Sequence, residues 1–177
     1  MLQLASLLMM VYSFVLIEIS VGKLPARIPT HFNAAGNADG WGSPDTLWVL
    51  LLAQVVTGLI FVGVPLIGQR WPQAVNLGTR RLSDFTPEQQ ARILPLLRDM
   101  TGYMSVLLNL FFVVMLRQII AAATAVHPHL FVPWPLGIML AGFVLITVYY
   151  LRRIFRVAKE PAERHSSLRS IGRSRSQ

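Results

Sequence analysis

The chain has no cysteine and few charges, and acidic residues are scarce, at 8 of 177 positions against 16 for Lys and Arg. The lack of cysteine excludes a disulfide framework, a thiolate metal site and a cysteine nucleophile. Charged residues make up 14% of the sequence, whereas they make up about 25% of an average soluble domain. Because 54% of the residues are hydrophobic, this shortage of charge predicts an integral membrane protein.

Four segments have the length and composition of membrane-spanning helices. A helix needs about 20 mainly apolar residues to cross a bilayer, and residues 2–21, 46–67, 103–126 and 134–151 meet that requirement. The first lacks a basic leader and is longer than the apolar core of a signal peptide, so we expect an uncleaved helix. The predicted fold is an all-α integral membrane protein whose four-helix transmembrane domain covers residues 1–155.

The distribution of Lys and Arg predicts the orientation. The connection 68–102 carries five Arg and the segment from residue 152 carries eight basic residues, whereas the connection 22–45 carries two and 127–133 carries none. Basic residues concentrate in cytoplasmic loops. We therefore predict a multi-pass protein of the cytoplasmic membrane with both termini and the connection 68–102 in the cytoplasm. The connections 22–45 and 127–133 then face outside.

The cytoplasmic connection contains a helix-start signal. Thr86-Pro87-Glu88-Gln89 is typical of a capping box with proline in the first turn. Ile93, Leu96 and Leu97 then follow at helical spacing. This pattern predicts an amphipathic interfacial helix before the third span, kinked at Pro95.

Residues 156–177 form a basic tail rich in Ser and Arg. The tail has little apolar surface to bury, so we expect it to be disordered. Basic residues at the membrane surface attract anionic lipids, and these, rather than nucleic acid, are the expected partners of the tail.

The connection 22–45 is the most informative segment, because it is polar and rich in turn-forming residues. Pro25 and Pro29 disfavour helix, and the glycines and Asx residues that follow favour turns. We predict an ordered outer loop between the first two helices. The candidate ligand-binding residues are Pro25, Pro29, His31, Phe32, Asn33, Gly36, Asp39, Trp41, Gly42 and Ser43.

His31 and Asp39 lie eight residues apart in this loop and can meet in space. The interpretation we favour is that they bond within the loop and hold its shape. A His–Asp pair also suits acid–base chemistry, and together with His127 and His129 it offers ligands for a metal ion. The spacing matches no known metal motif, so we predict no catalytic residue, no metal and no cofactor, and keep these four residues as weak metal candidates.

Two charges fall inside predicted spans. Glu18 lies near the end of the first span and Arg117 lies well inside the third, at similar depth. A charge in a membrane helix is costly unless it is paired. We therefore predict an intramembrane ion pair between Glu18 and Arg117, with a proton or ligand pathway and snorkelling of either side chain as alternatives. Gln54, Asn109 and Gln118 can extend a polar interior.

The outer loop contains a run of closely spaced motif residues, namely Leu24-Pro25, Ile28-Pro29-Thr30-His31-Phe32-Asn33, Gly36 and Asp39-Gly40-Trp41-Gly42-Ser43. This run resembles a bacterial membrane family, catalogued as domain of unknown function 1648, which also forms the N-terminal part of SdpI-like immunity proteins. Pro44 stands where the family pattern has a cation. The resemblance implies a small bacterial cytoplasmic-membrane protein with no established enzymatic activity.

Three functions follow as hypotheses. The leading one is a non-enzymatic membrane protein that recognises a peptide, a lipid headgroup or a membrane-protein partner through the outer loop. The first alternative is an accessory subunit of a larger membrane complex, with Gly58, Gly63, Gly137 and Gly142 permitting close helix contact. The second alternative is a metal-dependent membrane enzyme or a small transporter.

Overall fold

The computed structural model describes residues 1–33, 35–78, 80–130 and 133–159. Within these ranges a first helix is followed by a β-hairpin, and then by three further helices, with two short 3-10 turns before the third helix. The elements are α1 (Leu2–Val21), β1 (Ile28–Phe32), β2 (Ala38–Gly42), α2 (Thr46–Arg70), η1 (Pro72–Ala74), η2 (Leu82–Asp84), α3 (Pro87–Ala123) and α4 (Pro133–Lys159).

All four α-helices are long and apolar enough to cross a membrane, which confirms the predicted number of spans. α1 has the predicted bounds, whereas α4 continues to Lys159 instead of ending at Leu151. Residues 156–159, predicted as the start of the tail, therefore belong to a helix. The rest of the predicted tail lies outside the described residues.

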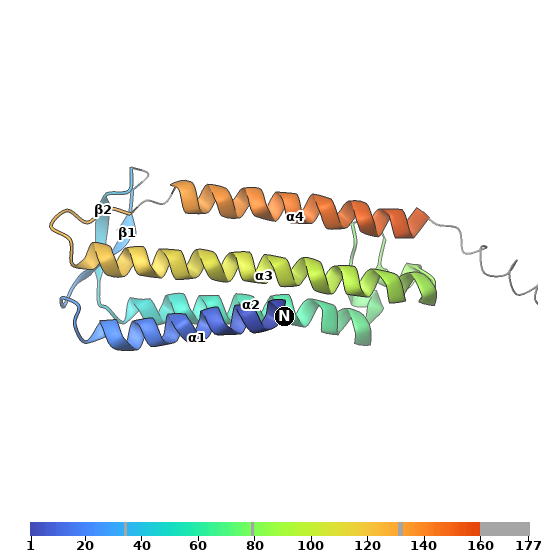
Figure 1. The fold of residues 1–177 in the computed structure, drawn as a ribbon, viewed down its shortest axis with the longest axis horizontal. Coiled ribbons are helices and arrows are strands. Elements are labelled where there is room, and N and C mark those ends of the chain that lie inside the picture. Colours follow the sequence, from blue (N-terminus) through green and yellow to red (C-terminus); the bar gives the residue numbers. More distant parts are fainter. Residues whose placement is uncertain (34, 79, 131–132, 160–177) are drawn as a thin grey trace, which may run out of the picture.

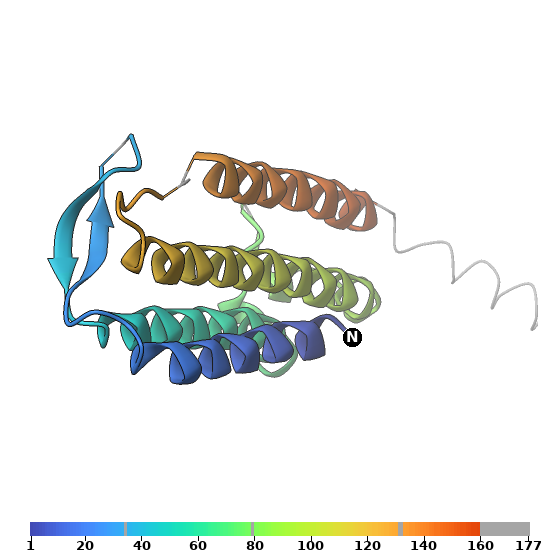
Figure 2. The same ribbon diagram turned by 60° about the vertical axis from the view of Figure 1, so that its left-hand side comes forward.

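Successive helices alternate in direction, so α1 and α3 end where α2 and α4 begin (Figure 1). The β-hairpin lies across that end of the molecule, as Figure 2 shows. We call it the hairpin end. The N-terminus and the last turns of α4 both lie away from the hairpin end (Figures 1 and 2).

α3 is the central helix, because it packs against α1, α2 and α4 (Figure 1). α4 is the most peripheral helix: 6% of its most apolar 18-residue window is buried, against 28% for α3. Leu107 of α3 packs over Gly142 of α4, and Phe61 of α2 lies against Phe143. The remaining apolar side chains of α4, among them Val144 and Leu145, are exposed.

The predicted interfacial helix is not a separate element, because the residues from Pro87 onward belong to α3. Its helix start is as predicted. The Gln89 amide donates to the Thr86 hydroxyl over 3.3 Å, and the Thr86 amide donates to the Gln89 side chain over 3.1 Å. With 37 residues and a rise of about 1.5 Å per residue, α3 is about 55 Å long, well beyond the hydrocarbon core of roughly 30 Å.

The apolar face of this α3 extension is covered by the chain itself. Ile93 and Leu97 are buried against Val75 and Leu82 of the connection between α2 and α3, and against Ile154 of α4. The connection is folded, with the Leu82 amide donating to the Val75 carbonyl over 2.9 Å. The predicted amphipathic segment is therefore a helical lead-in to the third span, and its buried side chains Ile93 and Leu97 pack against protein.

The outer loop contains a two-stranded antiparallel sheet, so the all-α prediction was wrong for this segment. Ile28 pairs with Gly42, and His31 pairs with Gly40. The register shifts on both sides of His31, which leaves Thr30 as an extra residue on β1 before it and Asp39 as an extra residue on β2 after it. Such bulges re-aim side chains, and here the bulge lies beside the two residues that were predicted to meet.

Candidate functional site

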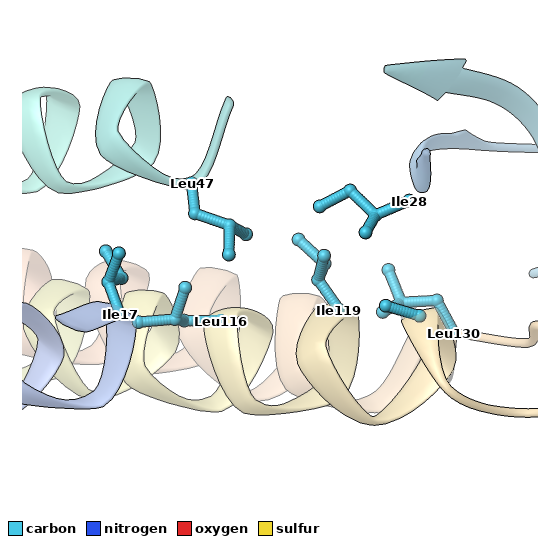
Figure 3. Close-up of a cluster of buried hydrophobic side chains, with 7 residues drawn as sticks. Ile17, Ile28, Leu47, Leu116, Ile119 and Leu130 are labelled. Carbon is cyan, nitrogen blue, oxygen red and sulfur yellow. The ribbon is translucent and has the colours of Figure 1, made fainter. Parts of the chain in front are cut away.

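The hairpin is fixed to the helices by a buried apolar cluster. Ile28 is 0% exposed and belongs to a cluster with Leu47, Ile119 and Leu130 (Figure 3). Pro29, next in β1, is also fully buried. Because burying a side chain of this size contributes about 1.5–3 kcal/mol, the hairpin is part of the folded core rather than a free loop.

Asn33 organises the tip of the hairpin. Its side-chain oxygen accepts hydrogen bonds from the amides of Ala35 (3.0 Å) and Asn37 (3.1 Å). Its backbone carbonyl accepts from the Gly36 amide over 2.8 Å. This is the local bonding that makes Asn favourable in turns, so Asn33 shapes the tip.

Gly36 joins the hairpin tip to the connection between α3 and α4. Its φ of +85° favours glycine, and a Cβ there would collide with the Leu130 carbonyl oxygen and lie 2.9 Å from Cε1 of His129. The Leu130 amide donates to the Gly36 carbonyl over 2.8 Å, and Nε2 of His129 lies 3.0 Å from the Ala35 carbonyl oxygen. His129 therefore positions the hairpin tip.

His31 and Asp39 meet as predicted. Nδ1 of His31 lies 2.5 Å from Oδ1 of Asp39, and the side chains are 73% and 43% exposed. The contact joins β1 to β2. Gly40 makes room for it, because a Cβ at that position would lie 2.8 Å from the His31 Cβ.

The motif residues divide into a structural set and an accessible set. Ile28, Pro29 and Gly36 are buried, whereas Trp41, two residues after Asp39 in β2, is 48% exposed. Phe32 and Gly42 are partly buried. We call His31, Asp39 and Trp41 the outward face of the hairpin. Four further motif residues are exposed along the segment, namely Pro25, Thr30, Asn33 and Ser43.

Ser43 shapes the entry into α2. Its hydroxyl donates to the Asp45 carboxylate over 2.8 Å and accepts from the Asp45 amide over 3.2 Å. Its carbonyl accepts from the Thr46 hydroxyl over 2.7 Å. The hydrogen bonds of Ser43 thus stabilise the junction between the hairpin and α2.

The four weak metal candidates do not assemble. Among the described residues, no group of three or more His, Asp or Glu is placed to hold a metal ion. His31 and Asp39 bond to each other, while the His129 ring turns to the Ala35 carbonyl and His127 is exposed.

Arg117 does not pair with Glu18 in the structure. Its Nη1 donates to the Tyr12 hydroxyl over 3.3 Å, and the one ion pair found in the described part of the chain is His31–Asp39. Glu18 is five residues from buried Ser13, or about 140° around the helix. Glu18 is therefore on an exposed face of α1.

A groove lies between α1 and α3 at the hairpin end. Its volume is about 400 Å³. Two basic side chains, three hydroxyls and several apolar side chains line it, and no acidic side chain does. The lining residues are Tyr12, Leu16, Ile19, Ser20, Lys23, Leu24, Arg117, Ile120, Ala121 and Thr124. We call it the basic groove.

Sequence reasoning missed Tyr12, Lys23 and Thr124 as members of one site. Only Arg117 carried a signal by itself, as a charge within a span. The remaining polar groups look like ordinary helix-end residues until α1 and α3 are known to be neighbours.

The polar interior was predicted in part correctly. Nε2 of Gln54 donates to Oδ1 of Asn109 over 2.9 Å, and both side chains are at most 2% exposed. Asn109 also donates to the Ser105 carbonyl over 2.8 Å. The Gln54–Asn109 bond ties α2 to α3, and both the side-chain oxygen and the side-chain nitrogen of Asn109 have hydrogen-bond partners.

Residues 8–57 match the family described as Domain of unknown function (DUF1648). The match covers α1 from its seventh residue onward, the hairpin and the first half of α2, and it confirms the predicted resemblance. No curated protein and no solved structure matches the chain.

Proposed function

We propose that this is a non-enzymatic protein of the bacterial cytoplasmic membrane that recognises a ligand or partner outside the cell through the outward face of its hairpin. The observation that carries the proposal is the contrast within one short segment. Ile28 and Gly36 fix the hairpin to the helices, while His31, Asp39 and Trp41 remain accessible. Binding residues are commonly presented in this way, on loops positioned by a rigid scaffold.

The orientation belongs to the same proposal. Arg70, Arg80, Arg81 and Arg92 lie at the end opposite the hairpin or in the connection there. Basic residues stay in the cytoplasm, so the hairpin faces outside and both termini are cytoplasmic. The basic tail then meets the anionic inner leaflet, which it attracts by charge.

An SdpI-like role, in which the partner is a peptide, is the most specific form of this proposal. It rests on the resemblance of the hairpin motif, and Pro44 in place of the family's cation separates this chain from the pattern. Because the proposed binding surface is His31, Asp39 and Trp41, it does not require a cation at position 44.

A photocrosslinking amino acid at position 41 tests the proposal in intact cells. Trp71, at the opposite end and similarly exposed at 54% against 48% for Trp41, is the matched control position. We expect a protein or peptide adduct at position 41 that disappears when His31→Ala and Asp39→Ala are added. Lipid adducts alone, or the same adducts at position 71, would refute recognition by the outward face.

The first alternative is an accessory subunit, and the exposed apolar face of α4 favours it. Leu145 and Val144 are 69% and 61% exposed. Of the glycines predicted to admit a partner helix, Gly58 and Gly142 are instead occupied by Met10 and Leu107 of the same chain. The same crosslinker at position 145 distinguishes this function, since a stoichiometric protein adduct there supports a subunit role.

The second alternative, a metal-dependent enzyme or a small transporter, has the least support. The described His, Asp and Glu residues form no group of three. Metal analysis of protein purified without chelator or His-tag tests it directly.

A further inference from the structure

We propose that the basic groove is a binding site for an anionic phospholipid of the leaflet at the hairpin end, with the lipid phosphate between Arg117 and Lys23. This site is separate from the outward face of the hairpin, and its support does not depend on the proposed function. The first argument is charge. Arg117 and Lys23 line the groove without an acidic neighbour in its lining, and neither forms an ion pair within the described ranges.

The depth of Arg117 supplies the second argument. Arg117 lies six residues before the end of α3, or about 9 Å from it along the helix. Its side chain is exposed on the helix surface, where lipid is its neighbour. A charge at such a position is costly in hydrocarbon, and local thinning with entry of headgroups and water lowers that cost.

The Tyr12 contact gives the third argument. By donating over 3.3 Å to the Tyr12 hydroxyl, Arg117 is held in the groove. A guanidinium has five N–H donors, and within the described part of the chain this is the one hydrogen bond that Arg117 makes. The remaining donors suit the oxygens of a phosphate, which a guanidinium can bind in bidentate geometry.

The rest of the lining matches the other parts of a phospholipid. Leu16, Ile19 and Ile120 present apolar surface that can contact an acyl chain. The hydroxyls of Ser20 and Thr124 also line the groove and can hydrogen-bond to the glycerol ester region. The volume of about 400 Å³ falls within the roughly 300–1,000 Å³ of small-ligand sites. A groove with two cations and an apolar wall favours a negatively charged lipid over a zwitterionic one.

Native mass spectrometry of the full chain, titrated with phosphatidylglycerol or phosphatidylcholine, tests this site. We expect wild type to prefer phosphatidylglycerol, and Arg117→Gln and Lys23→Gln each to weaken its binding about fivefold, the change expected for one cation at a membrane surface. Arg153→Gln is the matched control, because Arg153 is an exposed cation of α4 outside the groove. Arg153→Gln should leave the affinity for phosphatidylglycerol unchanged. This result would show that the loss of one surface charge elsewhere does not weaken lipid binding.

Two further variants and a competitor complete the design. Arg117→Lys keeps the charge and should retain most of the preference, while Tyr12→Phe removes only the hydroxyl and should weaken binding less than Arg117→Gln. Unchanged phosphatidylglycerol binding in both Arg117→Gln and Lys23→Gln, or equal losses in Arg153→Gln, would overturn the site. Competition by excess inorganic phosphate alone would identify a free-anion site and would overturn the lipid assignment.

Discussion

Nδ1 of His31 lies 2.5 Å from Oδ1 of Asp39, and this contact joins the two strands of the hairpin. It lies directly beside the bulge that makes Asp39 an extra residue of β2. Both side chains face solvent, so the same pair that closes the hairpin is available to a ligand. The pair can therefore serve structure and recognition together.

Asp39→Ala should loosen the hairpin without unfolding the protein. Exposed ion pairs contribute about 0–1 kcal/mol, whereas Ile28 and the tip bonds of Asn33 are untouched by the change. Hydrogen exchange should therefore speed up for amides of the two strands and stay unchanged in the helices. His127→Ala replaces another exposed histidine at the hairpin end and serves as the control; equal exchange in both variants would contradict the role of the pair.

Gly36→Ala should destabilise the protein more than Gly78→Ala. Both glycines have positive φ, +85° and +95°, so both substitutions carry the backbone strain of about 1 kcal/mol or more. Only Gly36 faces neighbours, since its Cβ would meet Leu130 and His129 while Gly78 has nothing within 4 Å. The difference between the midpoints of thermal unfolding of the two variants in detergent measures the cost of the contact between position 36 and the connection from α3 to α4. Equal midpoints would mean that this connection moves aside without cost.

The spans and the start of α3 could be predicted because their causes are local. Hydropathy over about 20 residues identifies a span, and the Thr86–Gln89 box marks a helix start by itself. The β-hairpin was missed because its stability comes from distant residues: Leu130 covers Ile28, and His129 bonds at the tip. No alternation of apolar residues in 28–42 marks two strands, since glycine and Pro29 occupy positions where such a pattern requires larger side chains.

The partner of Arg117 could not be predicted from its position along the helix alone. Pairing also depends on which way each side chain faces around its helix. Glu18 is exposed away from the Ser6, Ser13 and Ile17 stripe that α1 buries. Tyr12 reaches Arg117 instead, and no charge pattern in the sequence points to a tyrosine.

A double-mutant cycle on Gln54→Ala and Asn109→Ala should show coupling. Their hydrogen bond links α2 to α3 in the buried interior, and such bonds in membrane proteins contribute about 0.6 kcal/mol on average, with a maximum of about 1.7. Unfolding free energies in mixed micelles measure the coupling. The control cycle pairs Gln54→Ala with Thr124→Ala, because the Thr124 hydroxyl bonds to the end of its own helix. A coupling energy no larger than in this control would show that the bond between Gln54 and Asn109 does not stabilise the protein.

Labelling of single cysteines should determine the orientation on which the proposed recognition depends. The natural chain has no cysteine, so Asn37→Cys and Ser83→Cys each create one thiol, at exposed positions near opposite ends of the molecule. Because the Arg-rich connection stays in the cytoplasm, a membrane-impermeant maleimide should label position 37 in spheroplasts and position 83 only after permeabilisation. The reverse pattern would place the hairpin in the cytoplasm, and His31, Asp39 and Trp41 would then face cytoplasmic partners instead of extracellular ones.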